Sequence, residues 1–388
     1  MTEAAALASG TSSADLVIIG AGPVGMTLAL ALAGSSLHVL LIDSRARGAA
    51  ADDPRALALS YGSRQLLERL QAWNAAASTA IHQIHVSQRG GFGRTLIKAE
   101  DYKTPALGYV LRYRDLAATL DARLANGQLI DQCRIDHIET DDDGATLSVT
   151  QHETPRRIRT KLIVHAEGTP NDDPGIKVRD YEQQAIVAEV RPVPAHNNRA
   201  WERFTPDGPL ALLPLGQDYS LVFSVPPAKA AQLLALDDEA FLTALRKQFG
   251  QRLDFIASGP RTSFPLALRA RPQITQQRQV WIGNSAQALH PVSGQGFNLG
   301  LRDAWELADV LLEHRDAGNP AALARYANRR QPDRCGSMAF TDGIVRLFSN
   351  DLPPLRIARG LGLLALDLAP PLRHFVAKRL IWGARAWP

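Results

Sequence analysis

Cysteine is scarce in this chain of 388 residues, which contains only Cys133 and Cys335, far apart in the sequence. Two distant cysteines cannot form the disulfide framework that stabilises small secreted proteins. The composition fits a reducing compartment. We therefore expect a cytoplasmic protein in which both thiols are buried and unreactive.

A strong excess of charge of one sign is also missing, since the formal net charge is only +4 and aromatic residues make up 6% of the chain. No basic patch interleaved with aromatic residues stands out, so we expect no nucleic-acid partner. We also expect no metal. The hydrophobic content of 45% and the charged content of 21% are ordinary for a globular protein, and the length favours two domains.

An unbroken apolar run that could cross a membrane is lacking as well. Residues 16–33 are apolar over a sufficient length, but three glycines and a proline interrupt them. These are Gly20, Gly22, Pro23 and Gly25. No basic segment precedes the run, so we interpret it as part of a folded domain.

The interrupted run has the pattern of a dinucleotide-binding turn. An expected strand at 15–19 leads into Gly20-Ala21-Gly22-Pro23-Val24-Gly25, an expected helix at 26–33, and a second strand that ends at Asp43. Gly20 permits the tight turn, Gly22 lets the backbone approach a pyrophosphate, and Gly25 lets the helix pack on the strand. Asp43 lies where a carboxylate can accept the ribose hydroxyls, and its spacing from Gly22 favours this role over that of a plain strand-end residue. The pattern alone does not distinguish FAD from NAD.

A second stretch, residues 280–313, delivers a glycine-containing loop to the start of a helix. The apolar residues 280–282 indicate a buried strand, and Pro291, Gly294 and Gly296 mark the loop. Apolar residues from Leu301 onward fall on one helical face. Free N–H groups at such a helix start can hold a phosphate or the negative charge of a reduced flavin. The alternative is a tight loop before an ordinary core helix.

This second stretch carries a resemblance to a known family. Gly283-Asn284-Ser285-Ala286, His290-Pro291 and the segment 294–303 resemble the second flavin motif of the FAD-dependent aromatic hydroxylases. Asn284, Gln287 and His290 are most similar to the ubiquinone-biosynthesis branch, and within it to 2-polyprenyl-6-methoxyphenol hydroxylases. Most of the wider family has Asp where this chain has Asn284. The resemblance implies that the motif contacts FAD through Asn284, Pro291, Gly294, Gln295, Gly296, Phe297 and Asn298.

Three further segments match the family less completely. Arg55, in Asp53-Pro54-Arg55, resembles an arginine that lies beside the flavin, although it could also be a solvated loop residue. The family places a polar residue before the helix expected at 115–124, and Arg112 is the candidate, with Tyr113 and Arg114 competing. At Glu167-Gly168 the family usually has Asp-Gly followed by Arg-Ser. This departure leaves only Gly168 as a cofactor contact.

The implied fold class is α/β, with a Rossmann-like FAD-binding domain, an inserted sheet-rich substrate domain and a helical C-terminal segment. In the inserted region we expect strands at 180–190, 209–213, 219–225 and 261–268. The expected boundaries are 1–80, 105–180 and 275–351 for the discontinuous FAD-binding domain, 81–104 and 181–274 for the substrate domain, and 352–388 for the C-terminal segment.

The resemblance implies a flavin-dependent monooxygenase that hydroxylates a prenylated phenol with O2, in ubiquinone biosynthesis. NADPH or NADH would act as a transient co-substrate, because the chain has one dinucleotide turn and no second dinucleotide-binding domain. Other proteins of ubiquinone synthesis are possible partners. His290 is the only acid–base candidate in the flavin motifs, and its alternative role is to hold Pro291 in place. Alternative functions are another FAD-dependent prenyl-lipid oxidoreductase, a halogenase, whose W-x-W-x-I-P segment is missing, or a scaffold without catalysis.

The C-terminal segment, 352–388, differs in composition from the rest of the chain. It contains six basic residues against one acidic residue, together with many leucines and two tryptophans, Trp382 and Trp387. Basic apolar segments of this kind bind the surface of anionic membranes. We therefore expect either a peripheral contact at the inner face of the membrane or a terminal helical pair packed on the flavin domain. The two are compatible.

Overall fold

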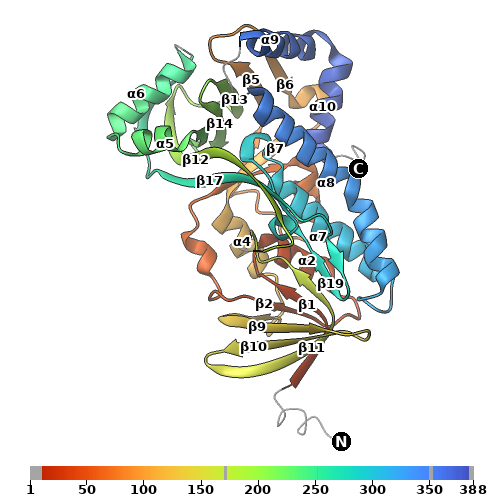
Figure 1. Ribbon diagram of the computed structural model, residues 1–388. Helices are drawn as coiled ribbons and strands as arrows, with labels where there is room; N and C mark the ends of the chain where they lie inside the picture. The colour runs from red at the N-terminus through yellow and green to blue at the C-terminus, as the bar shows by residue number, and fades with distance from the viewer. Residues whose placement is uncertain (1–10, 170–172, 251, 349–352, 384–388) are drawn as a thin grey trace, which may run out of the picture.

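The computed structural model describes residues 11–169, 173–250, 252–348 and 353–383. Figure 1 shows a parallel-sheet region that contains both the N-terminal and central parts of the chain, and a second sheet region above it. The long helix α8 (Pro320–Phe348) runs along both regions.

The first sheet has eight strands and is built around β1 (Thr11–Ile19), which is parallel to a strand on each side. Residues 16–18 are fully buried, as expected for a strand covered on both faces. The strand order is β18 (Thr275–Gln276), β19 (Gln279–Trp281), β11 (Thr154–His165), β1, β2 (Val39–Ile42) and β8 (Leu129–Ile130). The strand, glycine turn, helix and strand expected from the sequence are therefore confirmed.

The two faces of this sheet are covered differently. Helices α2 (Pro23–Ala31), α4 (Tyr113–Asp121) and α7 (Gly296–Leu312) pack on one face in a shared core. The hairpin of β9 (Cys133–Thr140) and β10 (Ala145–Gln151) extends from β11 and forms a smaller core with the other face. Cys133 is buried there, but Cys335 is exposed on α8, so the expectation of two buried thiols is wrong for Cys335.

The second sheet has nine strands and combines two separate parts of the chain. Its order is β20 (Gln287–Ala288), β17 (Thr262–Ala270), β12 (Lys177–Val193), β15 (Asp218–Val225), β14 (Gly208–Leu215), β13 (Arg199–Thr205), β5 (Gln83–Gln88) and β6 (Arg94–Lys98), and β16 (Asp254–Ser258) pairs with β12. Helices α5 (Pro227–Leu234) and α6 (Asp238–Phe249) cover one face. Four of these strands were expected between 180 and 268, but β13 and β16 were not.

A three-stranded sheet lies between the two large ones. It consists of β3 (Ala56–Ser60), β7 (Gly108–Arg112) and β4 (Thr79–Ile81). Helix α3 (Tyr61–Arg69) follows β3 directly in the chain. Short 3-10 helices complete the chain: η1 (Ala49–Asp52), η2 (Ala99–Tyr102), η3 (Gly283–Ser285) and η4 (Pro291–Ser293).

The C-terminal segment forms the helical pair α9 (Pro353–Leu368) and α10 (Pro370–Trp382), at the top of Figure 1. Helix α9 packs on β6, and α10 packs on α3 and β3. The pair therefore contacts both the second sheet and the three-stranded sheet. Arg385 and Trp387 lie outside the described residues. Within the described residues, no helix is long and apolar enough to span a membrane. The expected α/β fold with C-terminal helices is confirmed.

Candidate functional site

A cavity of about 520 Å³ lies where the glycine turn after β1 meets the loop before α7; we call it the dinucleotide cavity. Residues from the turn, from β3 and from the 282–300 loop line it. Eleven of the residues expected to contact the cofactor are among them: Gly20, Gly22, Pro23, Val24, Arg55, Gly168, Asn284, Pro291, Gly294, Gly296 and Phe297. Five do not line it: Gly25, Asp43, Arg112, Gln295 and Asn298.

The glycine turn is shaped by close backbone packing. Gly20 has φ +102°, and a Cβ atom there would lie 2.6 Å from the backbone of Ala166. A Cβ at Gly25 would lie 2.1 Å from the carbonyl oxygen of Gly20, so Gly25 allows α2 to approach the turn. A Cβ at Gly22 would meet only the hydroxyl of Tyr113, at 3.4 Å. Gly22 therefore leaves room inside the cavity rather than inside the protein core.

Two helices begin at this cavity without a capping side chain. The N-cap of α2 is Gly22, which has no side chain, and the N-cap of α7 is Gln295, whose side chain accepts no hydrogen bond from its helix. The first-turn N–H groups and the positive ends of two helix dipoles are therefore available to a ligand. This arrangement suits a dinucleotide with a pyrophosphate and a negatively charged ring, and the residues present fit FAD.

Asp43 lies at the edge of a neighbouring cavity of about 380 Å³, which shares Arg45 with the dinucleotide cavity. One carboxylate oxygen of Asp43 accepts a hydrogen bond from the backbone N–H of Ala21 at 2.8 Å, and both oxygens bind the Arg45 guanidinium at 3.1 Å. Burial opposes ionisation of this carboxyl, but the hydrogen bonds from Arg45 and Ala21 outweigh it and lower the pKa of Asp43. The carboxylate thus remains charged beside the space that an adenosine half could occupy.

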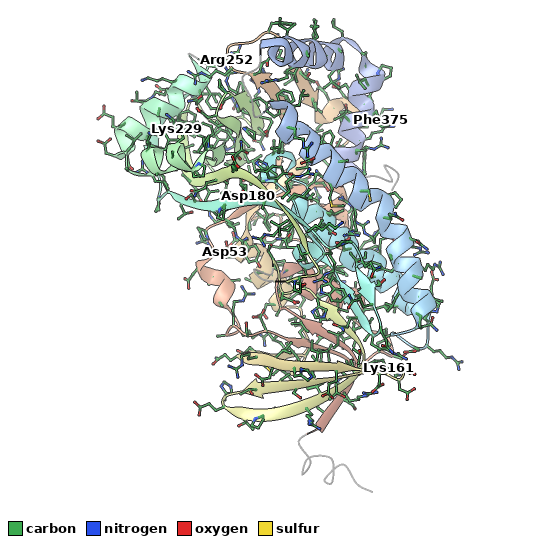
Figure 2. All side chains as sticks on the ribbon, in the orientation of Figure 1. Asp53, Lys161, Asp180, Lys229, Arg252 and Phe375 are labelled. Carbon is green, nitrogen blue, oxygen red and sulfur yellow. The ribbon has the colours of Figure 1, made fainter. Side chains whose placement is uncertain are left out.

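Tyr113, rather than Arg112, faces the dinucleotide cavity. Arg112 is the N-cap of α4 and turns away to bind Glu189, with Nη2 and Oε2 2.7 Å apart. Tyr113 lines the cavity, and the Arg55 guanidinium lies over its ring at 4.8 Å from the centroid. Arg55 also binds Asp53, which Figure 2 labels on the loop after η1. The sequence left Tyr113 as a competing candidate, and only the position of the helix start distinguishes it from Arg112.

His290 is fully buried and hydrogen-bonded within the protein. Its Nδ1 accepts a hydrogen bond from the N–H of Val292 at 3.1 Å, and its Nε2 lies 3.2 Å from Oε1 of Gln183. Burial lowers the pKa of His290 to about 4, so the ring is neutral at physiological pH. Both ring nitrogens are therefore used in holding the loop around Pro291, which is the alternative role expected for this residue.

The unusual Glu167 also has a partner that the sequence did not indicate. Its carboxylate lies 3.1 Å from Nδ1 of His165, whose Nε2 lies 2.9 Å from Oε1 of Gln279. The His165 ring stacks on Trp281 with 4.7 Å between centroids. The following residue, Gly168, accepts a hydrogen bond from the hydroxyl of Ser285 at 2.9 Å. The altered loop is thus attached to β19 and to the second flavin motif.

Asn298 and Gln295 act within the protein rather than in the dinucleotide cavity. The Asn298 side chain accepts from the N–H of Ser60 at 2.8 Å and donates to the carbonyl oxygens of Ala58 at 2.9 Å and Gly294 at 2.8 Å. Gln295 donates to the carbonyl oxygen of Leu380 on α10, at 3.4 Å. These two side chains connect the start of α7 to β3 and to the C-terminal helices.

A third cavity, of about 300 Å³, lies between the second sheet and helices α8, α9 and α10; we call it the apolar cavity. Side chains of β5, β6, β13 and β14 form one wall, and Leu363, Leu366, Val376 and Leu380 contribute to another. Five residues line both this cavity and the dinucleotide cavity: Ala58, Leu213, Val222, Pro291 and Gly294. The two cavities therefore adjoin at the loop before α7. The sequence indicated neither Leu213 nor Val222, because both belong to ordinary apolar strands.

Comparison with known proteins agrees with this geometry. Residues 13–339 match the FAD binding domain family. The ubiquinone hydroxylase UbiL of Rhodospirillum rubrum is 34% identical, with 97% of this chain and 91% of the relative covered. The 3-demethoxyubiquinol 3-hydroxylase of Escherichia coli is 31% identical, with 94% of this chain and 97% of the relative covered.

A solved structure shares the fold at low sequence identity. The p-nitrophenol 4-monooxygenase PnpA of Pseudomonas putida superposes with a TM-score of 0.77 at 15% identity, over 97% of this chain and 99% of that structure. The expected FAD cofactor and the expected family are confirmed. The chain belongs to the FAD binding domain family and, within it, to the ubiquinone hydroxylases, which are FAD-dependent monooxygenases.

Proposed function

We propose that this protein hydroxylates the aromatic ring of a prenylated phenol, of the 2-polyprenyl-6-methoxyphenol type, in ubiquinone biosynthesis. The observation that carries the proposal is the apolar cavity, which adjoins the dinucleotide cavity and shares Leu213, Val222 and Pro291 with it. A phenol ring at this border would lie against the cofactor, while its apolar tail fills the space under α9 and α10. The names of the relatives, which describe ubiquinone hydroxylases, support the same substrate class.

In this proposal the first-turn N–H groups of α2 hold the FAD pyrophosphate, and Asp43 accepts the ribose hydroxyls. Gly294, Gly296 and Phe297 at the start of α7 hold the flavin ring. The bound cofactor would supply the redox chemistry, with electrons from NADPH or NADH and with O2 as the source of one oxygen atom for the substrate ring and one for water. The α7 dipole stabilises negative charge on the ring, and the apolar border excludes water from it.

We also propose the domain division expected from the sequence, with the FAD-binding domain at 1–80, 105–180 and 275–351, and the substrate domain at 81–104 and 181–274. Support comes from the second sheet, whose strands lie at 83–98 and 177–270 apart from the two-residue β20. Because β20 lies in the 282–300 loop and pairs with β17, the second flavin motif is attached directly to the substrate sheet.

A peripheral contact with the inner face of an anionic membrane completes the proposal. Among the side chains of α9 and α10 whose burial the structure describes, six large apolar ones are exposed: Ile357, Leu361, Leu364, Leu368, Leu372 and Phe375. Figure 2 labels Phe375 on the outer side of α10. The same two helices line the apolar cavity with Leu363, Leu366 and Val376, so a lipid tail leaving the cavity would reach the surface between apolar groups. Exposed Lys378 and Arg379 add positive charge for anionic headgroups.

Coupled oxidation of NADPH tests the function. A short-prenyl 6-methoxyphenol should stimulate NADPH consumption and gain one labelled oxygen atom from O2, as measured by mass spectrometry. Its O-methyl ether should react poorly, because the free phenol donates electrons into the ring. Equal turnover of 4-hydroxybenzoate would refute the ubiquinone substrate and leave the hydroxylase activity standing. If no phenol stimulates NADPH oxidation and the bound flavin does not react with NADPH or NADH, the alternative function of a scaffold without catalysis is favoured.

A further inference from the structure

Glu202 is a carboxyl group in the wall of the apolar cavity. It lies on β13 between Trp201 and Arg203, whose side chains point to the opposite face of the sheet. Trp201 packs there against Phe249 of α6, and Arg203 binds the carbonyl oxygen of Gln248. Alternation along the strand places Glu202 on the cavity face, where it is among the lining residues.

The surroundings of Glu202 are apolar. Its pairing partners on the adjacent strands are Val86 on β5 and Ala211 on β14. Ile84, Phe204 and Leu213 line the same cavity. Burial raises the pKa of the Glu202 carboxyl well above its usual range, which favours the protonated, uncharged form.

Glu202 is also without a hydrogen-bond partner in the described part of the chain, and its Oε1 atom is shielded from solvent. The other polar side chains that line the cavity each have at least one partner within the protein, although Nε of Arg373 has none: Ser60, Thr95, Gln295, Asn298 and Arg373. A buried polar group without a partner lowers stability by roughly 1–3 kcal/mol. Its presence on an otherwise apolar wall therefore needs a ligand that completes it.

The position of Glu202 relative to the dinucleotide cavity is suitable for such a ligand. Glu202 pairs with Ala211, and Ala211 pairs with Val222, which lines both cavities. Adjacent strands are about 4.8 Å apart, so the backbones of Glu202 and Val222 are about 10 Å apart. A glutamate side chain and one aromatic ring together span that distance. A ring bound to Glu202 through its hydroxyl can therefore present another carbon at the border of the dinucleotide cavity.

We propose that Glu202 is the specificity-determining residue for the phenolic hydroxyl: its carboxyl oxygen accepts the hydrogen bond of the substrate O–H and so orients the ring at the border of the two cavities. This inference rests on the proposed function, since it assigns a role within that substrate site. It explains why a group that lowers stability stands in an apolar wall.

Ligand binding to the FAD-loaded protein tests the inference without turnover. Calorimetric titration in the absence of NADPH compares a short-prenyl 6-methoxyphenol with its O-methyl ether, which cannot donate the hydrogen bond. The wild-type protein should bind the phenol roughly tenfold more tightly than the ether, as one hydrogen bond to a buried acceptor predicts. Glu202→Gln, whose amide oxygen can still accept the bond, should keep most of this preference.

Glu202→Leu should lose the preference and bind phenol and ether about equally, while its melting temperature stays the same or rises because an unpartnered polar group is removed. Glu239→Gln, an exposed substitution on α6, is the matched control and should behave as wild type. If the Glu202→Leu protein keeps the wild-type preference for the phenol, Glu202 has no specific role. The same holds if it binds both ligands more weakly by the same factor and has a lower melting temperature. The inference alone then falls, because the wild-type protein still hydroxylates the phenol. If the wild-type protein binds neither ligand and oxidises no phenol, the proposed function falls, and this inference with it.

Discussion

Asp303 of α7 and Arg330 of α8 form a buried ion pair directly behind the second flavin motif, with Oδ1 and Nε 2.7 Å apart. The other carboxylate oxygen of Asp303 accepts hydrogen bonds from the N–H of Gly283 at 3.0 Å and from the side chain of Gln287 at 2.6 Å. Asp303 therefore connects the α8 helix to the loop that lines the dinucleotide cavity. We infer that this pair fixes the shape of the loop rather than contacting the cofactor.

Replacing Arg330 with Met should lower the free energy of unfolding by roughly 3–5 kcal/mol, because Asp303 is left as an unpaired buried charge. Urea denaturation measures the loss. Arg325→Met on the same helix is the control, since Arg325 pairs with Glu313 at an exposed position and its loss should change stability by less than about 1 kcal/mol. Equal effects of the two substitutions would contradict the role of the buried pair.

Gly22→Val should weaken FAD binding by more than about tenfold, because a branched side chain would enter the space that the pyrophosphate needs. The ratio of flavin to protein absorbance after purification reports occupancy, and heat-released FAD confirms the bound species. Gly343→Val on α8 is the control, since a Cβ there meets nothing within 4 Å. A folded Gly22→Val protein with full occupancy would show that the nucleotide lies elsewhere.

The glycine turn could be recognised from the sequence because its pattern has a local cause. Gly20 and Gly25 are recognisable because the backbone conformation and close packing of one turn require glycine at these positions. Arg112 could not be separated from Tyr113 in the same way, since the answer depends on where α4 begins. A shift of one residue at a helix start turns a side chain into or out of the cavity.

Other features depend on contacts between distant parts of the chain. Arg330 reaches Asp303 across a helix pair, and Glu202 reaches the apolar cavity only because β13 lies between β5 and β14. The strand that carries Glu202 was itself not expected, although Pro206-Asp207-Gly208 after it is a turn signal. The exposed Cys335 illustrates the same limit, because burial on a long helix is decided by what packs against it.

His290 should make the protein less stable in mild acid. Its folded-state pKa of about 4 lies below the ordinary value of 6.5, so the unfolded state binds a proton first as the pH falls. Stability is therefore fully present above about pH 6.5 and is lost progressively towards pH 4. At pH 5 the loss attributable to His290 should be about 2 kcal/mol. Urea denaturation at pH 7 and pH 5 should show a smaller difference in His290→Gln, and an unchanged difference would assign the effect to other groups.

Leu368→Asp should reduce binding to anionic liposomes severalfold in flotation at low salt, because Leu368 is 72% exposed on the apolar outer side of α9. Leu312→Asp is the matched control, since Leu312 is also exposed but lies at the end of α7. If wild-type protein ignores anionic liposomes at low salt, the C-terminal helices serve only for packing.

Ala211→Phe should weaken substrate binding without changing FAD binding. Ala211 lines the apolar cavity and not the dinucleotide cavity, so a phenyl group there should fill space meant for substrate while leaving FAD occupancy unchanged. In the wild-type protein each CH2 of a prenyl tail that becomes buried should contribute up to ~0.8 kcal/mol, so affinity should rise as the tail lengthens. Because Ala211 lies between Glu202 and Val222, the variant should weaken the binding of tailed and tail-less phenols alike, as calorimetric titration of a series of prenylated phenols can measure.

Ala231→Phe, at an exposed position on α5, provides the control for introducing a phenyl group and should retain the wild-type dependence. Affinity that falls only for tailed phenols in Ala211→Phe would place the tail, rather than the aromatic ring, beside β14. Affinity that does not change for any phenol would mean that the substrate does not enter the apolar cavity. The tail would then have to leave the dinucleotide cavity by another route, and the exposed apolar side chains of α9 and α10 would no longer be connected to substrate entry.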